Sequence, residues 1–376
     1  MSSGHQRSPR RMTQRTPALD ALAALAALAV VLTHARPGGW HGPGPLGVQC
    51  FFALSGYLLT QRLWADMDRP GWVGRYAWRR ALRILPLYWI AVAAVSIAEP
   101  TPLYLYLPWA AGWEAESPAL LPRTMLWSIG VEELAYSLLP WLLWRVRPAR
   151  LPWALAGTIV GCLALRWELR SLGPWPPYAW PVARLDSVAW GVLAAWIVRF
   201  RPRWGARAAE AGPWLVGAAV GAALWQEYWP GAWQPLCDLW AAAKGMGFCA
   251  LLVALGCHQL PGTSRVLAWP ALCWVGRISY PLYLGHAWVV LAVAAAWPGA
   301  GTGMRIAAVM VGGLALAAVL HYGVERPVQR LTVASGIGGL TSCRPRPGIP
   351  LTIATGAPRP SAPQPPAAAQ SSTSTS

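Results

Sequence analysis

Ten apolar segments of roughly membrane-spanning length dominate this sequence. A bilayer core of about 30 Å is crossed by roughly 17–25 mostly apolar residues in a helix. Lipid admits only helices and closed barrels as spanning structures. The chain is therefore predicted to be all-α, a polytopic bundle of about ten transmembrane helices, at residues 18–34, 46–62, 84–99, 125–144, 151–168, 182–200, 213–229, 236–257, 278–297 and 302–323. The apolar stretch 103–113 is too short to span, so we expect it to lie at the interface or to dip into the membrane as part of a long loop.

The placement of charge supports this interpretation and predicts an orientation. Only 12% of the 376 residues are charged, about half the share of an ordinary soluble chain, which argues against a soluble α/β enzyme. A net charge of +17 would suggest nucleic acid in a soluble protein, but the arginines lie in short loops between apolar segments. With the N-terminus inside, most of the 31 Lys and Arg fall on one side. The positive-inside rule then predicts that both termini are cytoplasmic. We also expect a bacterial-type plasma (inner) membrane and no nucleic-acid partner.

Composition divides the chain into three parts. Residues 1–17 form a basic cytoplasmic N-terminus, residues 18–330 the membrane domain, and residues 331–376 a Pro/Ser/Thr/Ala-rich tail. The tail lacks the apolar content for a core and is expected to be disordered in the cytoplasm. The seven cysteines show neither metal-ligand spacing nor a disulfide framework. We expect no metal site and no bound cofactor.

Ionisable residues within the apolar segments are the first candidates for a functional site, because each is costly in hydrocarbon. His34 ends the first segment near the outer face, and Glu132 lies roughly 10 Å below that face. Arg184 and Asp186 lie at the start of the segment 182–200, also near the outer face, and His286 lies within a later segment. These positions predict an outward-facing polar pocket. Two alternatives stay open: Arg184 and Asp186 can form a structural ion pair, and His286 can be a satisfied polar group on a helix face.

Another polar group lies near the inner end of the last segment. There Glu325 is expected to pair with Arg326 or to cap a chain turn before Pro327. We expect no catalytic role for it or for His321.

The opposite face carries a cluster of arginines before Ile84, in a predicted cytoplasmic stretch. Guanidinium forks match phosphate oxygens, so the cluster suits an anionic ligand. Contact with anionic lipid headgroups is the alternative. A basic inner mouth and a polar outer pocket fit transfer of a group from a phosphorylated cytoplasmic donor to an outer acceptor. The arginines are Arg75, Arg79, Arg80 and Arg83.

Seven segments, in order, resemble blocks of the acyltransferase-3 family, membrane enzymes that acylate hydroxyl compounds from acyl-CoA. The likeness covers about residues 18–330. The blocks are LDALAALAALAVVLTH from Leu19, GVQCFFALSGYLLT from Gly47, RRALRILPLYW from Arg79, LWSIGVEELAYSLLP from Leu126, RLDSVAWGVLAA from Arg184, GRISYPLYLGH from Gly276 and GVERPVQR from Gly323.

The resemblance implies roles for particular residues. His34 matches the family histidine of the chemical step, and a neutral imidazole suits a general base. Arg80 and Arg83 match the family's cytoplasmic arginine pair and are expected to hold the CoA phosphates. Apart from the resemblance, the depth of Glu132 in its helix suggests that it orients the histidine or binds acceptor hydroxyls. The predicted acceptor pocket is completed by Arg184, Asp186 and His286.

Two positions depart from the family pattern. Ala23 stands where members usually carry an arginine, and Gln49 replaces an aspartate. The resemblance implies an O-acyltransferase that is surrounded by membrane lipid and uses acyl-CoA, expected to be acetyl-CoA, as co-substrate. The acceptor is expected to be a hydroxyl of a glycan, a lipid-linked sugar or a glycosylated metabolite. The alternative is a non-catalytic or degenerate relative that binds or translocates such a substrate. The sequence leaves the acceptor, the acyl chain and the oligomeric state open.

Overall fold

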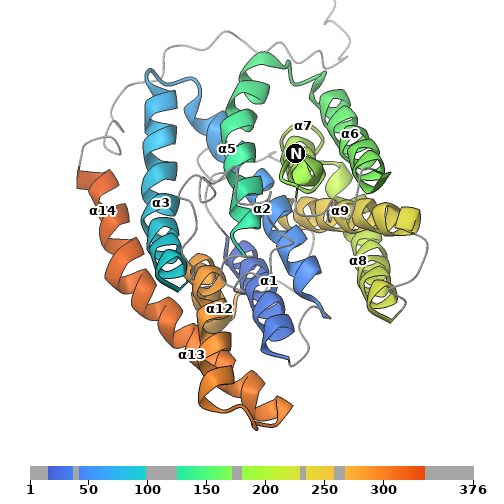
Figure 1. Ribbon diagram of the computed structural model, residues 1–376. Coiled ribbons are helices and arrows are strands. Elements are labelled where there is room, and N and C mark those ends of the chain that lie inside the picture. The colour runs from blue at the N-terminus through green and yellow to red at the C-terminus, as the bar shows by residue number, and fades with distance from the viewer. Residues whose placement is uncertain are drawn as a thin grey trace, which may run out of the picture. The chain divides into compact units, whose positions relative to one another are not determined.

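A computed structural model describes residues 16–36, 42–98, 125–171, 180–228, 234–257 and 267–334. Every regular element in these ranges is a helix, which confirms the all-α prediction (Figure 1). The predicted interfacial stretch 103–113 lies outside the described residues, as do residues 1–15 and the chain after Ala334.

A helix is present at each of the ten predicted segments. They are α1 (Pro17–Ala35), α2 (Gly44–Asp66), α3 (Trp72–Ala98), α5 (Trp127–Arg145), α6 (Leu151–Ser171), α7 (Leu185–Phe200), α8 (Trp204–Tyr228), α9 (Gln234–Gly256), α12 (Ser279–Ala296) and α13 (Thr302–Leu320). A 3-10 turn, η4 (Val182–Arg184), leads into α7, and α11 (Pro270–Arg277) leads into α12. After α13 the chain continues through η5 (His321–Glu325) into α14 (Arg326–Ala334).

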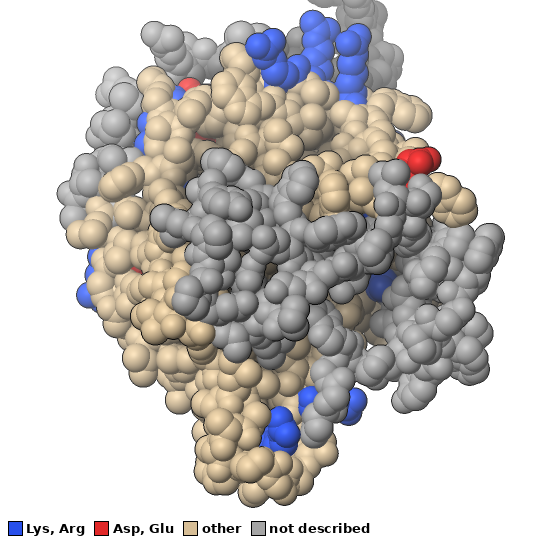
Figure 2. Space-filling model, viewed as in Figure 1, with Lys and Arg blue, Asp and Glu red and all other residues tan. Residues whose placement is uncertain are grey.

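Four of the described helices are long and apolar enough to cross a membrane. They are α1, α3, α12 and the continuous helix Thr302–Leu331. Others fall short for local reasons, since α7 has only 16 residues and α5 carries two adjacent glutamates. Basic side chains project from the upper edge of Figure 2, where Figure 1 shows the connection between α5 and α6. The ten spans and the position of the termini remain predictions.

Helix α3 begins 12 residues earlier than the apolar segment 84–99 predicts. Hydropathy marks the part of a helix that suits lipid, whereas the helix itself continues wherever the backbone allows. Arg80 and Arg83 therefore belong to the helix and not to a loop.

The last helix also extends further than predicted. A π turn at His321–Glu325 joins α13 to α14, and Pro327 lies in the first turn of α14, where a missing N–H is tolerated. The expectation for Glu325 was wrong, because its carboxylate contacts His321 Nδ1 at 2.7 Å and accepts from Gln329 Nε2 at 2.9 Å.

Close helix packing fixes the centre of the bundle. Helix α1 packs against α2, α11 and α12, and α2 packs against α7. At the α2–α7 crossing, a Cβ on Gly191 would lie 1.8 Å from the Ala53 carbonyl oxygen, and one on Gly56 would lie 2.3 Å from that of Val188. Only glycine permits such an approach, which is typical of membrane helix interfaces. A core of buried apolar side chains from α2, α3, α5, α6, α7 and α12 surrounds this crossing.

Candidate functional site

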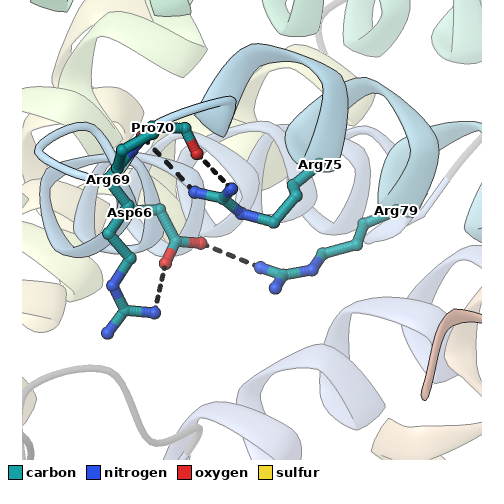
Figure 3. Close-up of polar contacts among 5 residues, drawn as sticks. All are labelled: Asp66, Arg69, Pro70, Arg75 and Arg79. Carbon is teal, nitrogen blue, oxygen red and sulfur yellow. Dashed lines mark hydrogen bonds and ion pairs between the residues drawn. The ribbon is translucent and has the colours of Figure 1, made fainter. Parts of the chain in front are cut away.

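The arginines of α3 divide into two sets according to helical face. Arg75 and Arg79 are four residues apart and share the face toward the corner between α2 and α3 (Figure 3). Arg79 Nη1 donates to Asp66 Oδ2 at 2.8 Å, and Arg75 donates to the Pro70 and Arg69 carbonyls. This set closes the corner.

Arg80 lies on another face of α3, toward α5. Its guanidinium carbon is 4.5 Å from the centre of the Tyr136 ring, within cation–π range. Arg80 lines a cavity of about 550 Å³ between α3 and α5, together with Glu133. Aromatic side chains form much of its wall: Trp72, Tyr76, Tyr136, Trp141 and Trp144.

Arg83 lines a second, inner pocket, which α1, α2, α3, α5 and α12 enclose. Glu132 and Tyr136 line it beside Arg83, and Ser128 and Tyr283 line it too. The Ser128 hydroxyl donates to Tyr283 Oη at 2.8 Å. The remaining wall is mostly apolar: Ala23, Val48, Phe51, Phe52, Leu54, Leu58, Ile84 and Ile129.

Glu132 is held by hydroxyl groups on both oxygens. Ser55 Oγ donates to its Oε1 at 2.9 Å, and the Tyr136 hydroxyl donates to its Oε2 at 2.8 Å. Two donors orient the carboxylate toward the inner pocket. Among the hydrogen bonds of the described residues, none joins this carboxylate to His34, so its geometry favours a pocket-lining role over orientation of the imidazole.

The structure brings His34 and His286 together, a pairing that the sequence did not predict. His34 is 9% exposed and His286 is 0% exposed. Their ring centroids lie 5.1 Å apart, and His286 Nε2 is 3.2 Å from His34 Nδ1. Neither lines the inner pocket, but Tyr283 does, and its ring centroid is 5.8 Å from that of His286. The first-helix imidazole therefore faces the bundle interior, next to the pocket wall.

The buried carboxylate of Asp186 pairs with Arg166 of α6. Arg166 Nη2 contacts Asp186 Oδ2 at 3.0 Å, with side chains 2% and 0% exposed. A second Arg166 nitrogen donates to the Ala183 carbonyl. The predicted partner Arg184 ends η4, half-buried, and neither it nor Asp186 lines the inner pocket. Arg166 is the residue that sequence reasoning missed, although a single arginine late in an apolar segment was a usable signal.

The two departures from the family pattern occupy defined places. Ala23 is 1% exposed and contributes to the wall of the inner pocket. Gln49 is also buried, and its Nε2 donates to the Ala241 carbonyl at 2.7 Å, which ties α2 to α9.

The fold and the site together define a class: a helical membrane protein with a pocket inside the helix bundle, lined by an arginine and a held carboxylate, and with a histidine pair next to the pocket wall. The chain belongs to the acyltransferase-3 family, whose profile, described as an acyltransferase domain, matches residues 16–322.

Named relatives agree with this assignment. The chain is 25% identical to acyltransferase MdmB of Streptomyces mycarofaciens over 335 residues, covering 77% of this chain and 81% of that protein. It is 30% identical over 170 residues to putative acetyltransferase ORF330 of Acidianus two-tailed virus, covering 40% of this chain and 47% of that protein. No solved structure gives a significant match. The findings support an acyltransferase.

Proposed function

We propose that this acyltransferase carries an acyl group, in the simplest case acetyl, from cytoplasmic acyl-CoA to a hydroxyl of a glycan, lipid-linked sugar or glycosylated metabolite. The observation that carries the proposal is the inner pocket, which has Arg83 in its wall and Tyr283, the neighbour of the histidine pair, in the same wall. Arg83, at the proposed donor end, thus lines the same pocket as Tyr283, and the histidine pair lies directly next to Tyr283.

The donor end suits a phosphorylated cofactor-like substrate. Arg80 faces a cavity with an aromatic wall, and Arg83 faces the inner pocket. Guanidinium groups bind phosphate oxygens through paired, charge-assisted hydrogen bonds, and aromatic rings stack on a nucleotide base. Tyr136 lies in the wall of both spaces. In the proposed arrangement the nucleotide occupies the cavity between α3 and α5, and the pantetheine arm reaches into the inner pocket.

The reaction needs one base and no redox partner. The acceptor oxygen attacks the thioester carbonyl carbon while His34 accepts the hydroxyl proton. The new C–O bond forms, the C–S bond breaks, and the proton passes from the imidazole to the departing sulfur, which gives an ester and free CoA. A general base of this kind contributes about 10²–10⁴-fold to a rate. Glu132, held by two hydroxyls, is placed to accept hydrogen bonds from the incoming acceptor.

The proposed membrane orientation has ten spans, with the α2–α3 corner and both termini in the cytoplasm. The basic side chains at the upper edge of Figure 2 support it, since positive charge favours the cytoplasmic side. In this orientation the arginines of α3 lie toward the acyl-CoA pool, and the end of α1 that carries His34 lies toward the outer face.

The test follows acyl transfer from radiolabelled acetyl-CoA in membranes that contain equal amounts of wild type, His34→Ala, Arg80→Ala and the control Arg79→Ala. Mass spectrometry of surface glycans and secreted metabolites, with and without the gene, identifies the acceptor by the added mass of one acyl group. We expect His34→Ala and Arg80→Ala to lose transfer and Arg79→Ala to keep it. Wild-type rates in both of the first two variants would contradict the mechanism.

A further inference from the structure

The contacts of the two buried histidines restrict where their protons can be. His286 Nδ1 lies 2.6 Å from the Tyr283 carbonyl oxygen. His34 Nδ1 lies 2.9 Å from the Val30 carbonyl oxygen. A carbonyl oxygen can only accept, so each of these ring nitrogens must carry a hydrogen.

A consistent assignment of the pair follows for neutral rings. With its proton on Nδ1, His286 has a lone pair on Nε2, and that lone pair is 3.2 Å from the Nδ1–H of His34. The His34 proton is then shared between the Val30 carbonyl and His286, and bifurcated hydrogen bonds are common at helix termini such as this one. The lone pair of His34 is therefore on Nε2.

We propose that His286 is a positioning residue: it accepts from His34 Nδ1–H and thereby holds Nε2 of His34 as the basic nitrogen of the acyl-transfer step. This rests on the proposed function, in which His34 takes the acceptor proton. It assigns to His286 a different role from the acceptor contact that the sequence suggested.

The surroundings of His286 hold its ring in one position, as a hydrogen-bond acceptor for His34 requires. Its side chain is 0% exposed, and its Nδ1 is held by the backbone of its own helix. Tyr283, one turn earlier, is fixed by the Ser128 hydroxyl of α5 at 2.8 Å. His286 is on α12 and His34 at the end of α1, and these helices pack against each other. The hydrogen bond between the rings thus joins two packed helices.

The pair also matches the charge that develops during the step. When His34 gains the acceptor proton on Nε2, its ring becomes a cation and its Nδ1–H faces two acceptors, the Val30 carbonyl and His286 Nε2. Hydrogen bonds from a cationic donor are roughly twice as strong as neutral ones. A neutral imidazole here supplies the orientation that the aspartate gives the histidine of a Ser-His-Asp triad, without burying a negative charge.

The test compares three substitutions that separate the two nitrogens of His286. Gln places its terminal amide near the position of Nε2 and can accept there, Asn places its amide near Nδ1 and cannot reach His34, and Phe fills the space without an acceptor. Purified wild type, His286→Gln, His286→Asn, His286→Phe and His34→Ala are assayed in lipid nanodiscs with labelled acetyl-CoA. The readouts are kcat, KM for acetyl-CoA and melting temperature.

We expect His286→Phe and His286→Asn to lose at least about tenfold in kcat, part of the contribution of a general base, with KM for acetyl-CoA within about twofold. His286→Gln should keep at least about a third of the wild-type kcat. Equal kcat for the Gln and Asn variants at matched abundance overturns the proposal, whichever value they share, and this holds even where Phe destabilises the bundle. Wild-type activity in His34→Ala instead overturns the proposed function, and the two failures are therefore distinguishable.

Discussion

Two regions of the molecule place arginine and carboxylate groups inside the bundle, and they do so in opposite ways. Between α6 and α7, Arg166 and Asp186 contact each other directly at 3.0 Å and are almost fully buried. Between α3 and α5, Arg80 stacks on a tyrosine ring and lines a cavity, while the nearby carboxylate of Glu132 is held by two hydroxyls.

The difference distinguishes charged groups that stabilise the fold from charged groups that can bind a ligand. When a buried carboxylate contacts an arginine directly, the two charges neutralise each other, and neither needs a ligand as counter-charge. A carboxylate that hydroxyls hold leaves the guanidinium groups beside it directed into space that a ligand can occupy. Breaking the first kind of contact should affect folding, and breaking the second should affect the substrate.

The largest effect is expected from Asp186→Leu. It leaves the Arg166 guanidinium buried without its counter-charge, which costs about 3–5 kcal/mol. We expect lower abundance in the membrane and a much lower melting temperature in detergent. The matched control is the double variant Arg166→Leu with Asp186→Leu, because an apolar replacement of a whole buried pair is often neutral. A single variant that melts like wild type would show that the pair does not support the fold.

Arg80→Ala should weaken donor recognition without loss of the fold. A charge-assisted hydrogen bond contributes about 1.5–3 kcal/mol, so we expect kcat/KM for acetyl-CoA to fall about 10–100-fold. The control is the donor itself: with S-acetylpantetheine, which lacks the nucleotide phosphates, Arg80→Ala and wild type should react equally fast. A loss that is the same for both donors would assign Arg80 a structural role.

Glu132→Gln should have an intermediate effect. The neutral amide replaces one accepting oxygen with a donor, which faces either the Ser55 or the Tyr136 hydroxyl. We expect a loss of about 1–3 kcal/mol in acceptor binding or in stability, measured by acceptor KM and by melting temperature. Ser55→Ala removes one donor and keeps the charge, and its effect should be smaller. The opposite order would mean that the hydroxyl, and not the carboxylate, matters here.

The smallest effect is expected from Arg79→Ala. Its ion pair with Asp66 is partly exposed, with side chains 41% and 25% accessible, and such pairs contribute about 0–1 kcal/mol. Acyl transfer should stay within about twofold of wild type, and any change in melting temperature should vanish in high salt. A loss as large as that of Arg80→Ala would remove the distinction between the two faces of α3.

Much of the architecture was predictable from apolar segment length, because lipid restricts the chain to helices and each predicted segment contains one. Boundaries were less predictable. The start of α3 and the end of α14 extend into polar sequence, since helix formation depends on the backbone and not on hydropathy alone. The π turn before Pro327 has no simple signal in the sequence.

The candidate residues were predictable by type but not by partner. His34, Glu132 and the arginines of α3 stood out as ionisable groups in or beside apolar segments. The pairing of His34 with His286, 252 positions away, depends on how α1 and α12 pack, and Asp186 found its counter-charge on α6 and not two residues away. Such contacts are tertiary, and a single sequence without an alignment does not contain them.

The glycine contacts between α2 and α7 limit how the enzyme can admit its substrates. Because Gly56 and Gly191 bring the two backbones together, the α2 wall of the pocket is anchored and cannot slide without clashes. Room for the proposed acceptor would then come from α3, α5 or α12, so that one wall of the pocket is fixed and the walls opposite it can adjust.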